Sequence, residues 1–96
     1  MRTLVKISIP VAAGNDAVKN GTLPKVFAES TERLKPEAAY FMTENSQRTA
    51  LFFIDFKDVA DMPMVAEPFF QGLNAAVTFT PVMNADDLRK GLGTTS

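Results

Sequence analysis

A β-hairpin spanning Ala39–Phe56 is the feature that most constrains how this 96-residue chain can fold. Its two arms are rich in aromatic and β-branched residues, and the polar triplet Asn45-Ser46-Gln47 separates them as a turn. A stretch with helical spacing lies on each side of the hairpin, and a strand-like run lies near each end of the chain. The order of elements is therefore strand, helix, strand, strand, helix, strand.

The spacing of apolar residues and the positions of turn-forming residues indicate the bounds of each element. We expect strands over Thr3–Val11, Ala38–Glu44, Arg48–Phe56 and Ala76–Val82. We expect helices over Leu23–Leu34, Asp58–Leu73 and Ala85–Lys90, with a short helical turn at Ala17–Asn20.

Helix-breaking and capping residues refine these bounds. Gly14-Asn15-Asp16 is interpreted as a break after the first strand, with Asn15 as a helix cap. Pro68 predicts a kink or a break near Glu67-Pro68. Asn84 is expected to cap the C-terminal helix, which Gly91 ends.

The predicted fold class is α+β, as a ferredoxin-like βαββαβ sandwich with a four-stranded antiparallel sheet and a short extra C-terminal helix. The length fits one domain, which we place at 1–92, with a mobile tail at 93–96. The more uniformly apolar side of each strand should lie under the helices. This assigns to the core Val5, Ile7, Ile9, Phe52, Ile54, Phe56, Val77 and Phe79.

The opposite face of the sheet is expected to be open, and it mixes apolar, charged and hydroxyl side chains. Strand two is partly apolar on both sides; we place Tyr40, Met42 and Glu44 on the open face and Phe41 inside. The other strands contribute Lys6, Ser8, Leu51, Phe53, Asp55, Thr78 and Thr80. Such a face is too apolar to be left in water, so a second subunit, a ligand or RNA should cover it.

Two short segments, Pro36–Phe41 and Glu67–Phe70, are similar to segments of small uncharacterised bacterial proteins of one group. From Val5 to Leu88 the chain resembles that group, the dimeric α/β barrels among the ferredoxin-like proteins. The resemblance implies that two subunits face their sheets together and enclose a cavity. The group includes cofactor-free monooxygenases, isomerases, haem-degrading enzymes and effector-binding modules, and fold analogy does not choose among them.

The composition narrows the chemistry that such a cavity could perform. The chain has no His, Cys or Trp, which removes the commonest general acid/base, thiolate chemistry and the usual haem and zinc ligands. We therefore predict no cofactor and no metal site, and we assign Asp86-Asp87 to helix capping. A net charge of −1 argues against nucleic acid as a partner. No apolar run predicts a membrane span, so a cytoplasmic location is expected.

The open face supplies the candidate site residues. Tyr40 would orient a substrate, Asp55 or Glu44 would act as a base, and Lys6 would stabilise developing negative charge. Ligand contacts are expected from Ser8, Met42, Arg48, Leu51, Phe53, Thr78 and Thr80. Some of these residues also have a purely structural interpretation. The charged groups could form an ion-pair network at a dimer interface, the ring of Tyr40 could pack there, and Arg48 could pair with Glu44.

These expectations combine into a homodimeric small-molecule-binding protein, either a simple binder or a cofactor-independent enzyme of monooxygenase or isomerase type. Its ligand would be an apolar or aromatic carbonyl or hydroxyl compound held in the barrel cavity. The alternative is a non-catalytic interaction or structural module whose open sheet face only forms the dimer.

Overall fold

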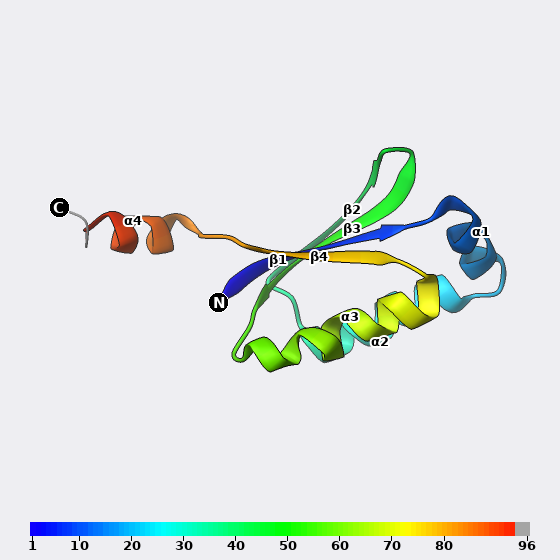
Figure 1. Ribbon diagram of the computed structural model, residues 1–96, viewed down its shortest axis with the longest axis horizontal. Coiled ribbons are helices and arrows are strands. Elements are labelled where there is room, and N and C mark those ends of the chain that lie inside the picture. Colours follow the sequence, from blue (N-terminus) through cyan, green and yellow to red (C-terminus); the bar gives the residue numbers. More distant parts are fainter. Residues whose placement is uncertain (94–96) are drawn as a thin grey trace.

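Four antiparallel strands form one sheet, in the order β2-β3-β1-β4, in the computed structural model, which describes residues 1–93 (Figure 1). The strands are β1 (Arg2–Ile9), β2 (Ala38–Glu44), β3 (Gln47–Asp55) and β4 (Ala76–Pro81). The helices are α1 (Val11–Lys19), α2 (Thr22–Leu34), the short 3-10 helix η1 (Val59–Asp61), α3 (Met62–Leu73) and α4 (Ala85–Gly93). This confirms the α+β class and is compatible with a ferredoxin-like arrangement.

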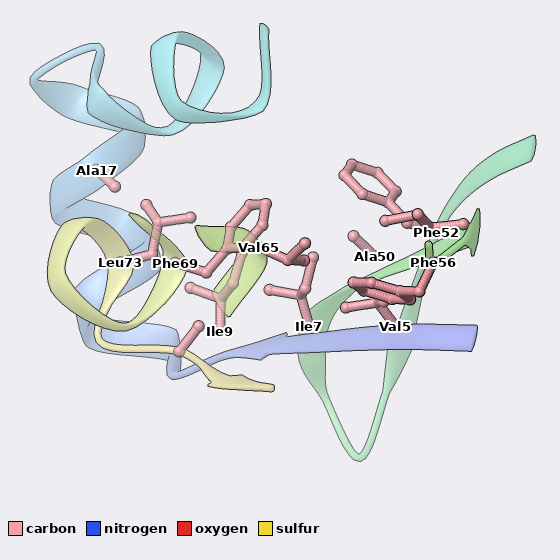
Figure 2. Close-up of a cluster of buried hydrophobic side chains, with 12 residues drawn as sticks. Val5, Ile7, Ile9, Ala17, Ala50, Phe52, Phe56, Val65, Phe69 and Leu73 are labelled. Carbon is pink, nitrogen blue, oxygen red and sulfur yellow. The ribbon is translucent and has the colours of Figure 1, made fainter. Parts of the chain in front are cut away.

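The core lies between the sheet and helices α2 and α3, which run side by side along one sheet face (Figure 1). Strand β1 alternates half-buried and buried residues along its whole length, as a strand covered on one side must. Figure 2 shows Ile7 and Ile9 of β1 pointing toward Phe69 and Leu73 of α3. The predicted core is confirmed, except that two residues on the edge strand β4 are only partly buried: Val77 and Phe79.

The hairpin between β2 and β3 turns on Asn45 and Ser46 alone. Both residues have positive φ angles, 53° and 63°, as a two-residue type I′ turn requires. Glu44 therefore lies directly opposite Gln47, and β3 begins one residue earlier than predicted. This register places Tyr40 opposite Leu51, which confirms the predicted face of strand two. Phe41 lies on the helix side as predicted but is 64% exposed rather than inside, because β2 is an edge strand.

The predicted break at residues 14–16 is wrong, because helix α1 runs through it. Strand β1 ends at Ile9, and Pro10 caps the new helix. Gly14 is buried inside α1, where an added Cβ atom would lie 2.6 Å from Nη1 of Arg48 and 3.3 Å from Ile9. Gly14 therefore serves a close packing contact and does not end the helix. The chain turns later, at Gly21, whose φ is +81°.

Helix α3 also continues through Pro68 without the predicted break. A proline inside a helix lacks the N–H that would bond to the carbonyl four residues earlier, here that of Met64. The Met64 carbonyl instead accepts a hydrogen bond from Nη2 of Arg33 on α2, at 3.4 Å. A neighbouring helix thus satisfies the freed acceptor and helps α3 to stay continuous.

At the C-terminal end, the chain leaves the sheet and forms a separate helix, α4, beyond the end of β4 (Figure 1). Asn84 caps it as predicted: its Oδ1 accepts from the Asp87 amide at 2.7 Å, and the Asp87 carboxylate accepts from the Asn84 amide at 3.1 Å. The helix continues to Gly93, past the predicted end at Gly91. The rest of the predicted tail, 94–96, lies outside the described residues.

Replacing Pro68 by alanine should raise the free energy of unfolding by about 2 kcal/mol. Alanine restores the backbone hydrogen bond to Met64 and removes a helix-interior proline. Part of this gain is offset because the unfolded chain becomes more flexible without the proline. Urea denaturation followed by circular dichroism measures the change. Arg33→Met should lower the free energy of unfolding less in the Pro68→Ala variant than in the wild type, because the Met64 carbonyl then bonds to the new backbone amide at position 68 instead of Arg33. Equal costs would contradict this role of Arg33.

Candidate functional site

The open face of the sheet is the candidate site, and the strand register arranges its residues in rows across the sheet. One row consists of Tyr40, Leu51, Lys6 and Thr78. On the hairpin side of this row lie Met42, Thr49, Ser8 and Ala76. On the other side lie Ala38, Phe53, Leu4 and Thr80. The register therefore brings most of the predicted site residues onto one continuous surface.

Polar contacts join three of the four strands on this surface. Nζ of Lys6 donates to both carboxylate oxygens of Glu44, at 3.0 and 3.2 Å, with both side chains about two-thirds buried. Ser8 donates through its hydroxyl to Oε1 of Gln47, at 2.9 Å. Glu44 thus pairs with Lys6 across β3 rather than with Arg48, so the expected Glu44–Arg48 pair does not form.

Aromatic and aliphatic side chains surround these polar groups. The ring of Tyr40 packs edge-to-face against that of Phe53, with centroids 6.4 Å apart. Tyr40 is nevertheless 60% exposed, and no described group hydrogen-bonds to its hydroxyl. The phenol is therefore available as a donor at the surface, on an apolar support.

Asp55 lies far from the Lys6–Glu44 pair. It lies opposite Arg2, eight residues along β3 from the partner of Glu44, so about 27 Å of strand separates the two predicted bases. Its carboxylate accepts from the amino group of Met1 at 3.3 Å and lies 3.5 Å from Nζ of Lys57. The hydrogen bond from the Met1 amino group, followed by the charge of Lys57, lowers the pKa of Asp55.

Arg48 lies on the helix side of the sheet, because it shares its strand face with Ala50 and Phe52. Its Nη2 donates to Oδ1 of Asn15 on α1, at 3.1 Å. A cavity of about 380 Å³ lies beside it, between helix α2 and the hairpin. Arg48 is therefore separated from Tyr40 and Lys6 by the sheet itself.

Sequence reasoning missed five residues of the open face: Leu4, Ala38, Gln47, Thr49 and Ala76. Thr49 sits in the middle of the surface and is only 3% exposed, and Gln47 holds Ser8. The alternation along β3 could have found both, since every second residue before Leu51 faces the same way. The prediction began that strand at Arg48 and so stopped short of Gln47.

Two negative findings concern residues 1–93. No group of three or more metal-ligating side chains lies close enough together there to hold a metal ion. Every helix in this part of the chain is too short or too polar to cross a lipid bilayer.

Comparison of the chain with family models, curated proteins and solved structures found no match. The class of the protein therefore follows from its architecture. It is a small α+β protein whose four-stranded antiparallel sheet, in the order β2-β3-β1-β4, is compatible with a ferredoxin-like arrangement and carries helices on one face.

The stability of the protein should fall as the pH is lowered below about 4, in part because of Asp55. A carboxyl group with a lowered pKa in the folded state stabilises the fold above its unfolded pKa, and this stabilisation disappears as the pH falls through the folded pKa. Asp55→Asn should therefore show a shallower loss of stability in acid, measured by urea denaturation between pH 2 and 7. Identical pH dependence in the variant and the wild type would contradict this assignment.

Proposed function

We propose that this protein is a homodimer whose open sheet faces pack together and hold a small molecule between them. The observation that carries the proposal is the uncovered face itself. Helices α2 and α3 lie on the opposite side of the sheet, while the open face presents five apolar side chains: Leu4, Tyr40, Met42, Leu51 and Phe53. A continuous apolar surface of this kind is characteristic of an interaction site.

The exposure of helix α4 is a second reason to expect association of two copies. The helix has nine residues and none of them is buried, and Figure 1 shows it extending beyond the end of the sheet. An ion pair of 3.7 Å between Asp87 and Arg2 connects its first turn to β1. Isolated helices of this length are marginal in water, even with a capping box. Leu88 and the preceding Met83 are 46% and 66% exposed. A second copy would supply the apolar surface on which these side chains pack.

The polar groups of the open face suggest what the space between the sheets would bind. Lys6 is held by Glu44 near the centre, and Tyr40 offers a hydroxyl to which no residue in the described part of the chain hydrogen-bonds. Both can donate to a carbonyl or hydroxyl oxygen, while Leu51 and Phe53 provide apolar walls. The proposed ligand is a small apolar or aromatic compound with one such oxygen, and Thr78 and Thr80 flank it on β4.

Any proton transfer in this space is assigned to Glu44, because Asp55 lies at the far end of the sheet. Covering the face with a second sheet would remove water from the Lys6–Glu44 pair and strengthen their interaction. Lys6 would then polarise the ligand oxygen while Glu44 accepts a proton from the adjacent carbon or hydroxyl. This chemistry needs no cofactor.

Introducing a charge on the open face should convert the dimer to a monomer. Leu51→Glu places a carboxylate in the middle of the proposed interface, so light scattering at micromolar concentration should give the mass of one chain instead of two. Val59→Glu is the matched control, because Val59 is 68% exposed on η1, away from the sheet face. A monomeric wild type, or a dimeric Leu51→Glu, would contradict the proposed interface.

A ligand for the space between the sheets should raise the thermal unfolding temperature of the dimer. At 100 times its dissociation constant a ligand adds about 2.7 kcal/mol of stability, which a thermal-shift screen of carbonyl and hydroxyl compounds detects readily. Tyr40→Phe and Lys6→Met should reduce the shift without dissociating the dimer. A stable dimer that no compound stabilises would favour the alternative, a module whose open face serves only assembly.

A further inference from the structure

The cavity beside Arg48 is a second candidate site, on the opposite side of the sheet from the proposed dimer face. Helix α2 contributes Leu23 and Phe27, and the strands contribute Ile9, Phe41 and Ala50. Its volume of about 380 Å³ falls within the range of roughly 300–1,000 Å³ seen for small-molecule pockets. Phe41 is 64% exposed, so the cavity opens to solvent along the edge strand β2.

Two aromatic rings line this cavity, those of Phe27 and Phe41, and Phe52 lies behind them in the core. Phe27 packs edge-to-face against Phe41 and Phe52, with centroids 5.5 and 5.9 Å apart. Phe52 is fully buried, whereas Phe27 is half-buried and Phe41 exposed. The contacts fix the rings in position before any ligand arrives, so an apolar ligand would meet a preformed wall at little conformational cost.

Arg48 is the one charged residue that lines this cavity, and no carboxylate among residues 1–93 lies within ion-pair distance of it. A guanidinium has five N–H donors, and within residues 1–93 only one donor of Arg48 has a hydrogen-bond partner, Asn15. By contrast, Arg2 pairs with Glu37 and Asp87. A half-buried cation with free donors is suited to an anion, and its planar fork fits a carboxylate.

Gly14 explains how Arg48 stays in this position. The guanidinium lies so close to helix α1 that a Cβ atom at residue 14 would come within 2.6 Å of Nη1. The missing side chain therefore lets Arg48 lie against α1, where Asn15, one residue further along, holds its Nη2. This arrangement holds the guanidinium against α1, next to a cavity whose wall is almost entirely apolar.

We propose that this cavity binds a small monocarboxylic acid with an aliphatic or aromatic body, its carboxylate held by Arg48 and its apolar part against Phe27, Phe41 and Leu23. Apart from Arg48, the lining of the cavity is almost entirely apolar, so it would leave the amides of a peptide without hydrogen-bond partners. A free acid therefore fits the cavity better than a peptide C-terminus. Met42 borders both this cavity and the open face, so the site adjoins the proposed dimer interface at the edge strand β2.

Decanoate and 1-decanol form a matched pair of probes, because they share the chain and differ in the charged group. Titrations of ¹⁵N-labelled protein below the micelle concentration should show saturable shifts for decanoate at the amides of Leu23, Phe41 and Ala50. Arg48→Gln should weaken decanoate binding by tenfold or more, the range for hydrogen bonds to a charged group, and leave decanol binding unchanged. Arg33→Gln, which removes a distant arginine, should alter neither.

Gly14→Ala provides a second variant that keeps the guanidinium but displaces it from α1. It should weaken decanoate more than decanol, which separates a role of Arg48 in binding from a general loss of folding. The proposal is overturned if decanoate fails to bind saturably at these amides. It is also overturned if Arg48→Gln weakens decanoate and decanol equally, or if it has no more effect than Arg33→Gln.

Discussion

The register between β1 and its two neighbours is the constraint on which the rest of this structure depends. Val5 lies opposite Phe52 on one side and Phe79 on the other, and Ile7 lies opposite Ala50 and Val77. All these side chains consequently point to the same face and meet helices α2 and α3 there. A slip of one residue would turn every one of them to the other face and bring Lys6 and Ser8 into the core.

The same register determines what the uncovered face contains. Because the core takes alternate residues, Lys6, Leu51 and Tyr40 are left together in one row, and the long side chain of Lys6 reaches Glu44 near the hairpin. One face of the sheet is thus packed against helices, whereas the described part of the chain packs no helix on the other face. Helix α4, which has no buried residue, repeats this imbalance at the end of the chain. The proposed association of two copies would cover both the open face and α4.

Much of this architecture was predictable, and the failures have identifiable causes. Period-two alternation put Tyr40 and Phe41 on opposite faces, and the register confirms this. It did not predict that Phe41, on the helix side, would be 64% exposed on the edge strand. Alternation also assigns Arg48 to the side of Ala50 and Phe52, and counting along β3 separates Asp55 from the turn. Grouping these residues by chemistry alone, rather than by register, put Arg48 and Asp55 into the predicted site together with Glu44.

The errors in the helices have a different origin, because tertiary contacts decided them. Gly14 and Pro68 are helix breakers by intrinsic preference. In the fold, Arg48 occupies the space that Gly14 leaves, and Arg33 donates to the carbonyl that Pro68 frees. Neither long-range contact is visible in the local sequence.

The central claim is that the open faces of two copies meet. Isotope-filtered nuclear Overhauser spectra of a mixture of ¹³C-labelled and unlabelled protein test it directly, because they report only contacts between copies. The account predicts intermolecular contacts to the methyl groups of Leu4, Met42 and Leu51. Intermolecular contacts confined to the outer surfaces of α2 and α3, or none at concentrations where the protein self-associates, would contradict it.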